Sequence, residues 1–303
     1  KYMTSTEALR LKKLPKSLIV IGGGYIAAEL AHFFGSLGSK ITIIQRNVRL
    51  IPNVDEEIAD KFTKLFSEKY NIVLNHEVLE VKKNGSNIDV YAKNAGNGKM
   101  AKFSGEQLLL AVGRISNTDL LDVSAGGIEV NERGFVKVNP FLETNHEGVW
   151  AIGDIAGIYQ FKHSANLEAK YAFINAYSKN KKPVDYRAMP YAIFSNPEVA
   201  GVGITEQEAK QKAINYVTGR YDYINTGMGT AILDESGFVK FIVDKASRKI
   251  LGCHILGTQA STLIHEVVIA MRLGDGTIDG IKEAVHVHPS LSEVVQRAAL
   301  NVK

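Results

Sequence analysis

A glycine-rich turn near the start of the chain has the residue types and spacing needed to hold a diphosphate. The segment Gly22-Gly23-Gly24-Tyr25-Ile26-Ala27 fits the pattern G-x-G-x-x-A. Gly22 allows a tight turn, Gly24 lets the backbone approach a pyrophosphate, and Ala27 is small enough for a helix to pack on a strand. The free N–H groups at the start of that helix would face the anion. The turn follows an apolar strand and opens a helix, which favours a dinucleotide site over a structural turn.

The choice between NADH and NADPH depends on the end of the next predicted strand. NAD-binding proteins usually place Asp or Glu there, on the ribose 2′-hydroxyl, whereas this chain has Gln45-Arg46. A missing carboxylate removes repulsion against a 2′-phosphate, and Arg46 or Arg49 could pair with one. Both arginines could equally be plain surface residues. The sequence therefore slightly favours NADPH and leaves NADH open.

These residues require a parallel sheet to position them. Short apolar runs alternate with helical patterns in the first third of the chain, which predicts a Rossmann-like α/β fold with a parallel sheet covered by helices. A small antiparallel meander is expected after it, with turns at Asn84-Gly85 and residues 94–98. The expected strands are residues 18–21, 40–44 and 72–74, the helices are residues 25–36 and 55–69, and the meander lies between about 78 and 103.

The rest of the chain has a different texture. Residues 116 to 187 form a stretch too short for a core of its own, so we expect it to complete a sheet built elsewhere. The last region, from about 188, has segregated strands and helices, which predicts an α+β domain. The expected strands are residues 135–138, 149–152, 191–194, 238–244 and 250–256, and the expected helices are residues 164–178, 261–273 and 291–300.

Composition excludes several classes of protein. The chain has 303 residues, a net charge of +4 and 45% hydrophobic residues, as in an ordinary globular protein. No apolar run approaches the ~18 residues of a membrane span, and the basic residues are scattered rather than gathered into a nucleic-acid-binding stripe. Cys253 is the single cysteine. An intrachain disulfide and a multi-cysteine metal site are therefore excluded, no metal is expected, and a reducing cytoplasmic setting is the simplest inference.

Further motifs lie before and after the glycine turn, and together with it, in this order along the chain, they resemble the pyridine nucleotide-disulphide oxidoreductase family. That family includes dihydrolipoamide dehydrogenase, glutathione reductase, mycothione reductase and mercuric reductase. The resemblance implies an NAD(P)H-binding domain over residues 1–115, the central part of an FAD-binding domain over 116–187, and a dimerisation domain over 188–303. The motifs are Thr4–Leu9, Leu14–Leu18, Ala111–Asn117, Ala151–Asp154, Phe194–Gly203 and His286–Glu293.

The resemblance also implies roles in cofactor binding. Gly113 belongs to the crossover out of the nicotinamide domain, Asp154 contacts the flavin, and His163 and Ala165 lie beside the isoalloxazine. Tyr25 shields the flavin where nicotinamide docks, and Glu29, one helical turn later on the same face, neighbours the nicotinamide. Other interpretations remain: Asp154 as a turn former, His163 as a surface residue, and Tyr25 and Glu29 as a packing residue and a solvated residue. Ile26 completes the expected nucleotide-binding turn.

His288 and Glu293 carry the sharpest functional hypothesis. A thiol–disulfide enzyme needs a base near neutral pKa, because the thiolate is the nucleophile. Imidazole supplies that base, and a nearby carboxylate fixes its tautomer. The spacing H-P-x-x-x-E resembles the family's catalytic dyad, which acts on the active site of the other subunit of a homodimer. The rival interpretation is that Ser290-Leu291-Ser292-Glu293 is a capping box for the last helix.

The chain also departs from the family. Family members begin with a flavin domain that has its own G-x-G-x-x-G and a C-x-x-x-x-C redox pair, and neither occurs here. We therefore expect the C-terminal two-thirds of an FAD- and NAD(P)H-dependent disulfide oxidoreductase, most like dihydrolipoamide dehydrogenase. The alternatives are a mycothione reductase- or mercuric reductase-like enzyme, or a non-catalytic nucleotide-binding and dimerisation module. The expected substrate is a small dithiol or disulfide, and the isolated chain is expected not to turn over disulfides.

Overall fold

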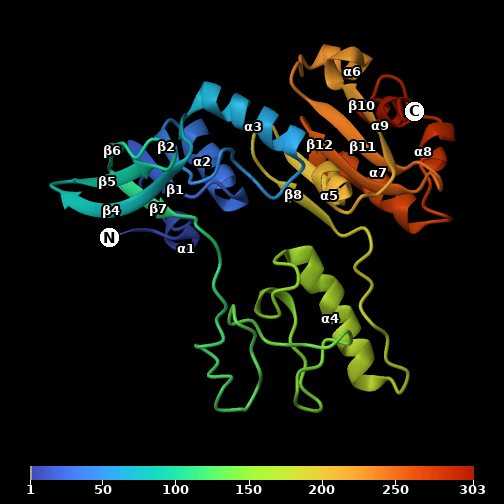
Figure 1. Ribbon diagram of the computed structural model, residues 1–303, viewed down its shortest axis with the longest axis horizontal. Helices are drawn as coiled ribbons and strands as arrows, with labels where there is room; N and C mark the ends of the chain where they lie inside the picture. Colours follow the sequence, from blue (N-terminus) through green and yellow to red (C-terminus); the bar gives the residue numbers. More distant parts are fainter. Residues whose placement is uncertain (1) are drawn as a thin grey trace. The chain divides into compact units, whose positions relative to one another are not determined.

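The computed structural model describes residues 2–303 and divides the chain into two compact units (Figure 1). The first unit is built from two separate stretches, up to Gly113 and from Pro190 onward. The second unit is the intervening segment Arg114–Met189. The nucleotide turn and the His288 segment therefore belong to the same unit, whereas Asp154 belongs to the other.

A four-stranded parallel sheet forms one part of the first unit, with strand order β3-β2-β1-β7. Helix α2 (Tyr25–Ser36) connects β1 to β2, and helix α3 (Glu56–Lys69) connects β2 to β3. This arrangement confirms the Rossmann-like parallel sheet predicted from the sequence. The strands are β1 (Ser17–Ile21), β2 (Lys40–Ile44), β3 (Asn71–Val73) and β7 (Gln107–Leu110), and a short helix α1 (Ser5–Ala8) precedes them.

The two faces of this sheet are covered by different structures. Successive residues of a strand point to opposite faces. Accordingly, Leu18 and Val20 join the buried cluster of α2 and α3, while Ile19 packs with Ile88 and Val90 of the meander. Helices therefore cover one face only, and the other face is covered by the antiparallel strands β4 (His76–Asn84), β5 (Asn87–Asn94) and β6 (Met100–Gly105).

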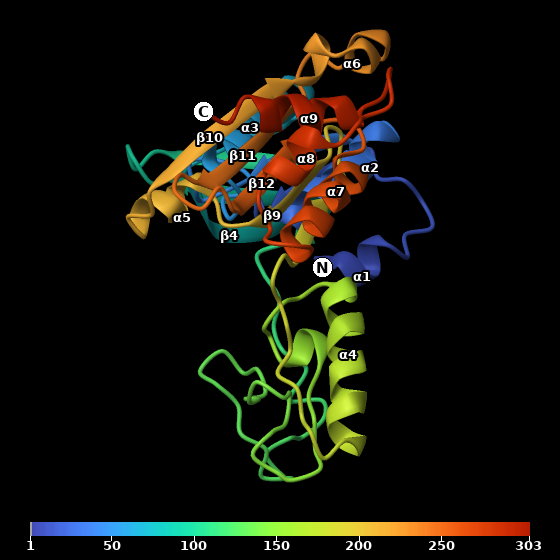
Figure 2. The same cartoon turned by 90° about the vertical axis from the view of Figure 1, so that its right-hand side faces the viewer.

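The remainder of the first unit is a five-stranded antiparallel sheet, with strand order β10-β11-β12-β9-β8. Figure 2 shows α7, α8 and α9 in front of its strands. On its other side, Ile193 and Phe238 belong to the same buried cluster as Phe62 of α3. The strands are β8 (Pro190–Ile193), β9 (Val199–Gly203), β10 (Tyr216–Asp222), β11 (Phe238–Asp244) and β12 (Ile250–Leu256); the helices are α5 (Glu206–Gln211), α6 (Gly227–Ala231), α7 (Ala260–Arg272), α8 (Asp279–Glu283) and α9 (Ser292–Leu300), with a 3-10 turn η2 (Tyr223–Asn225).

The second unit contains one long helix, α4 (Lys162–Tyr177), and a 3-10 turn, η1 (Gly153–Ile155). The strands predicted at residues 135–138 and 149–152 are wrong. Val136 and Trp150 form isolated bridges, with Val130 and Glu143 respectively, instead of ladders. A strand needs a neighbouring strand to pair with along its length, and the described segment supplies each run with a single bridging residue.

Candidate functional site

The turn after β1 has a geometry that only glycine accommodates at its first position. Gly22 has φ +109°, and its N–H donates to the carbonyl of Ile44 at 2.9 Å. A β-carbon on Gly22 would lie 2.2 Å from the carbonyl oxygen of Ala111. A side chain there would displace the strand that follows the meander, so Gly22 is required for the close approach of these two segments.

The third glycine faces open space at the start of α2. Gly24 is the N-cap residue of α2 and has no side chain that could accept a hydrogen bond from the helix N–H groups. No atom lies within 4 Å of the position that a β-carbon on Gly24 would take. Ala27, one turn later, is fully buried, and Ile26 is partly buried beside it. An open helix start with its N–H groups uncapped by side chains is the geometry that a diphosphate binds. The turn therefore fits a dinucleotide.

The residues expected to contact the ribose or its 2′-phosphate differ in their exposure and in their partners. Gln45 is 5% exposed; its Oε1 accepts the backbone N–H of Arg46 at 2.9 Å, and its Nε2 lies against Gly23. Arg49 forms ion pairs with Glu56 at 3.2 Å and Asp60 of α3 at 3.0 Å. Arg46 is exposed. The charge of Arg49 is thus already balanced within the protein, which leaves Arg46 as the better candidate for a 2′-phosphate.

Two residues of α2 were expected near the nicotinamide. Tyr25 is half-buried, and Glu29 is partly buried with its Oε1 accepting the backbone N–H of Phe194 at 3.0 Å. Burial raises the pKa of Glu29, against the opposing effect of the Phe194 N–H. Glu29 therefore links α2 to the end of β8, a role in packing that the sequence did not indicate. Its contact with nicotinamide, like that of Tyr25, stays a prediction.

Gly113 ends the first stretch of the first unit. It has φ +146° and open space around its β-carbon position. This conformation is one that glycine adopts without strain. Its contact with a cofactor stays a prediction.

In the second unit, the flavin-contacting residues expected from the sequence lie around η1. Gly153 has φ +71°, and a β-carbon on it would lie 3.3 Å from the side chain of Ala165 in α4. Its N–H donates to Oε2 of the fully buried Glu168 at 2.5 Å. Asp154 forms an ion pair with Arg114, and its side chain is 45% exposed. An exposed carboxylate next to a glycine can accept a hydrogen bond from a ribityl hydroxyl, so the site fits that group.

His288 and Glu293 are in contact at the start of α9. The Nδ1 atom of His288 lies 3.0 Å from Oε1 and 3.1 Å from Oε2 of Glu293. The same carboxylate accepts the backbone N–H of Ser290 at 3.0 Å. The hydrogen bond with His288, followed by that from Ser290, lowers the pKa of Glu293. The histidine side chain is 72% exposed.

The structure also supports part of the rival interpretation, in which the carboxylate of Glu293 caps the start of α9. Glu293 satisfies a backbone N–H before α9, as the carboxylate of a capping box does, but α9 has no N-cap side chain that accepts a hydrogen bond. Glu293 thus contacts both the ring and the helix start. Gly227 of α6 lies next to the ring: a β-carbon there would be 3.3 Å from Cε1 of His288.

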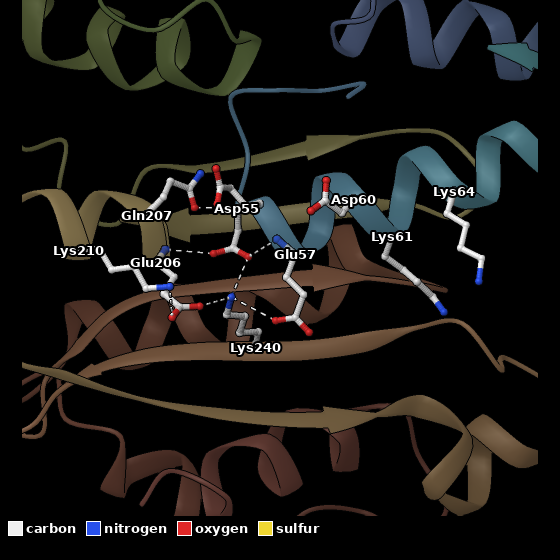
Figure 3. Close-up of a pocket in the computed structure, with 10 residues that line it drawn as sticks. Asp55, Glu57, Asp60, Lys61, Lys64, Glu206, Gln207, Lys210 and Lys240 are labelled. Carbon is white, nitrogen blue, oxygen red and sulfur yellow. Dashed lines mark hydrogen bonds and ion pairs between the residues drawn. The ribbon is translucent and has the colours of Figure 1, made fainter. Parts of the chain in front are cut away.

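Sequence reasoning missed two clusters of charge. Lys240, in the middle of β11, has a buried ammonium group that contacts Asp55, Glu57 and Glu206 (Figure 3). The other is the partly buried pair formed by His286 and Glu266, whose Nε2 and Oε1 atoms are 2.6 Å apart. A lysine inside an otherwise apolar strand is the signal that could have directed attention to the first cluster.

Two negative findings apply to the residues that the structure describes. No group of histidine, cysteine and carboxylate side chains among them could hold a metal ion. None of their helices is both long and apolar enough to span a bilayer. Cys253 is fully buried, and burial raises the pKa of its thiol, as expected for an inert cysteine.

Comparison with known families identifies the class of protein. Residues 1–169 match the pyridine nucleotide-disulphide oxidoreductase family, and residues 189–299 match the dimerisation domain of pyridine nucleotide-disulphide oxidoreductases. The chain therefore belongs to this family, and the resemblance drawn from its motifs is confirmed.

Individual relatives cover the whole chain. Mycothione reductase from Mycobacterium tuberculosis is 35% identical over 307 residues, which cover 100% of this chain and 66% of that protein. Dihydrolipoyl dehydrogenase from Vibrio cholerae is 36% identical over 297 residues, which cover 97% of this chain and 62% of that protein. The chain thus spans about two thirds of the length of these relatives or slightly less.

The fold has a solved counterpart as well. The HOCl-induced flavoprotein disulfide reductase RclA from Escherichia coli superposes with a TM-score of 0.90 at 28% identity. The match covers 99% of this chain and 67% of RclA in its Cu(II) complex. This agreement confirms the fold class expected from the sequence.

Proposed function

We propose that this chain supplies the nicotinamide-binding, central and interface regions of a flavin-dependent disulfide oxidoreductase most like dihydrolipoamide dehydrogenase. The observation that carries the proposal is the 3.0 Å contact between His288 Nδ1 and Glu293 Oε1 beside an exposed ring. Family membership supports the redox class, and the identities to dihydrolipoyl dehydrogenases support the substrate class, a small dithiol or disulfide.

The chemistry of His288 follows from its tautomer. A carboxylate only accepts hydrogen bonds, so the contact with Glu293 places a proton on Nδ1 and leaves the lone pair on Nε2. Nε2 then takes a proton from the incoming dithiol and generates the thiolate that attacks a disulfide. Glu293 stabilises the imidazolium that results. In this proposal the dyad serves the active site of a second copy of the chain, which the dimerisation domain supports.

The cofactors are assigned to residues of this chain by fit. Gly22, Gly24 and Ala27 hold the diphosphate of NAD(P)H, and exposed Arg46 pairs with a 2′-phosphate, which favours NADPH. When bound, FAD supplies a two-electron acceptor between the nicotinamide and the thiols. Asp154 accepts a hydrogen bond from the flavin's ribityl chain. Because Cys253 is the single cysteine and is buried, thiol–disulfide exchange requires a cysteine pair from outside this chain, and the isolated chain does not turn over disulfides.

The test uses the assembled enzyme, in which this chain is joined by the cysteine pair that exchange requires, supplied with FAD and with oxidised nicotinamide for dihydrolipoamide or reduced nicotinamide for lipoamide. Oxidation of dihydrolipoamide and reduction of lipoamide are measured for wild type and His288→Gln. We expect the substitution to lower kcat by about 10²–10⁴-fold, the usual contribution of a general acid–base group, while reduction of the flavin by nicotinamide is preserved. Turnover of lipoamide that survives the substitution would remove the dyad from the mechanism.

A second candidate, mycothione reductase, is favoured by the 35% identity over the whole chain and by Gln45-Arg46. Assaying mycothiol disulfide and lipoamide side by side with NADPH separates the two candidates by their kcat/KM values. An absence of turnover with every disulfide would leave the chain as a nucleotide-binding and dimerisation module.

A further inference from the structure

A buried ammonium group joins the two sheets of the first unit. The side chain of Lys240 in β11 is 4% exposed, and its Nζ lies 3.0 Å from Asp55 Oδ1, 3.2 Å from Glu57 Oε2 and 2.6 Å from Glu206 Oε2. Figure 3 shows the three carboxylates converging on Nζ from the starts of α3 and α5. We call Lys240, Asp55, Glu57 and Glu206 the Lys240 cluster. It borders a hollow of about 520 Å³.

Asp55 connects the starts of two helices. Its Oδ1 accepts the N–H of Glu57 at 3.2 Å, which caps α3, and its Oδ2 accepts the N–H of Glu206 at 3.0 Å, at the start of α5. Gln207 adds two bonds, donating to the carbonyl of Val54 at 2.9 Å and accepting the N–H of Glu56 at 3.2 Å. The start of α3, which belongs to the nucleotide-binding part, is therefore fixed to the dimerisation domain.

The charges in the Lys240 cluster are mutually dependent. Burial alone would raise the pKa of Glu206, but hydrogen bonds from Lys240, Lys210 and Tyr216 lower it to about 2. Glu57 is shared with Arg220, whose Nε lies 2.7 Å from Oε1. Removing the ammonium would leave the carboxylates of Asp55, Glu57 and Glu206 facing one another without a cation between them, and their repulsion would displace the fully buried Asp55.

A short loop leads to Asp55 and contacts the glycine turn. The N–H of Ile51 donates to the carbonyl of Gly23 at 2.6 Å, and the carbonyl of Ile51 accepts the N–H of Val54 at 3.2 Å. The side chain of Leu50 contacts Gly23 so closely that a β-carbon there would lie 2.9 Å from it. The backbone of Gly23, the middle glycine of the turn, is therefore contacted by the loop of residues 50–55, which ends at Asp55.

We infer that Lys240 is a positioning residue for the dinucleotide turn, because it fixes Asp55 and, through the loop that ends there, the backbone of Gly23. The inference rests on the proposed role of this turn in binding NAD(P)H. Lys240 lies in the dimerisation domain and need not touch the cofactor. Its effect is on the preorganisation of the turn, and hence on dinucleotide affinity.

The test measures binding of NADH and NADPH to the chain by calorimetry, together with its melting temperature. The variant Lys240→Met is compared with Lys64→Met, which removes an exposed lysine of α3 that lines the same hollow. We expect Lys240→Met to weaken both dinucleotides by about three- to tenfold at a temperature where the protein is folded, and amide hydrogen exchange at Gly23 and Ile51 to accelerate. Lys64→Met should change neither property.

The outcomes separate the inference from the proposed function. If wild type binds no dinucleotide, the proposed function fails. If wild type binds and folded Lys240→Met binds equally well, with a lower melting temperature only, Lys240 is structural and the inference is overturned. Should Lys240→Met not fold, Lys240→Gln decides, because it removes the charge and retains a hydrogen-bond donor toward Asp55. An unchanged Kd in that variant also overturns the inference; a rise of about twofold supports it.

Discussion

The carboxylate of Glu293 holds the ring of His288 and the backbone N–H of Ser290 at the same time, each at 3.0 Å. One side chain thereby orients the candidate base and secures the segment that leads into α9. A substitution at Glu293 therefore affects proton transfer and local stability together, and the two effects must be measured separately.

The stability effect of Glu293 depends on pH. Its pKa is lowered by the hydrogen bond with His288 and by that from Ser290, so its stabilising contribution is present above its ordinary pKa and is lost as pH falls through the lower folded value. We expect Glu293→Gln to lower the melting temperature near pH 7 and to approach wild type below about pH 4. Thermal melts across this range test it, with the exposed Glu283→Gln as a control. A difference that stays constant with pH would contradict the assignment.

Replacing the first or the third glycine of the turn by alanine should have different effects. Gly22→Ala forces a β-carbon against the carbonyl of Ala111 at positive φ, and should lower the free energy of unfolding by about 1–3 kcal/mol. Gly24→Ala meets no atom within 4 Å, and should leave stability almost unchanged while weakening NAD(P)H binding. Chemical denaturation and calorimetry measure the two effects. Equal stability of the two variants would argue against the close approach at Gly22.

Cofactor preference should depend on Arg46 and little on Arg49. Arg49 is already paired with Glu56 and Asp60, whereas Arg46 is exposed. We expect Arg46→Ala to weaken NADPH about tenfold, as for the loss of one charge-assisted hydrogen bond, and to spare NADH. Arg49→Ala should change the ratio of the two affinities little. Kd values for both dinucleotides in both variants decide the matter, and an unchanged ratio in Arg46→Ala would refute the phosphate argument.

The second unit should depend on the buried carboxylate of Glu168. It accepts the N–H of Gly153 at 2.5 Å and the hydroxyl of Tyr186 at 2.9 Å. Burial, followed by the hydrogen bond to Glu168, raises the pKa of Tyr186, so the phenol remains a donor. Glu168→Ala leaves the buried N–H of Gly153 and the partly buried hydroxyl of Tyr186 without this acceptor and should cost about 2–4 kcal/mol.

Limited proteolysis measures the effect of Glu168→Ala locally, because cleavage should accelerate within residues 114–189 and not in the first unit. Glu168→Gln retains one acceptor oxygen and should show an intermediate rate. Uniform acceleration across the whole chain would show that the loss is global.

The elements that sequence predicted well are those fixed by local pattern. The turn at Gly22–Ala27, the helix after it and the parallel strands follow from short-range spacing and apolar periodicity. The contact between His288 and Glu293 spans five residues, so one turn and the start of a helix determine it. The family and the fold class could be predicted from the sequence for the same reason.

The features that sequence did not predict depend on distant partners. Lys240 contacts Asp55, which is 185 residues earlier in the chain, and nothing in the spacing of an apolar strand identifies such a partner. From the sequence, Arg49 was a candidate to pair with a 2′-phosphate, because its ion pairs with α3 form only in the folded loop. The runs at residues 135–138 and 149–152 have strand composition, but composition does not supply the neighbour that a ladder needs.

The shared buried cluster of the first unit sets a limit on how this chain can be shortened. Ile193 and Phe238 pack with Phe62 and the other apolar residues of the nucleotide-binding half. A truncated polypeptide that stopped before Pro190 would keep every residue of the glycine turn and yet expose this apolar surface to water. We therefore expect the dinucleotide-binding half to lose stability when it is expressed without the antiparallel sheet, and a transfer to another scaffold should keep that sheet or cover the same apolar residues.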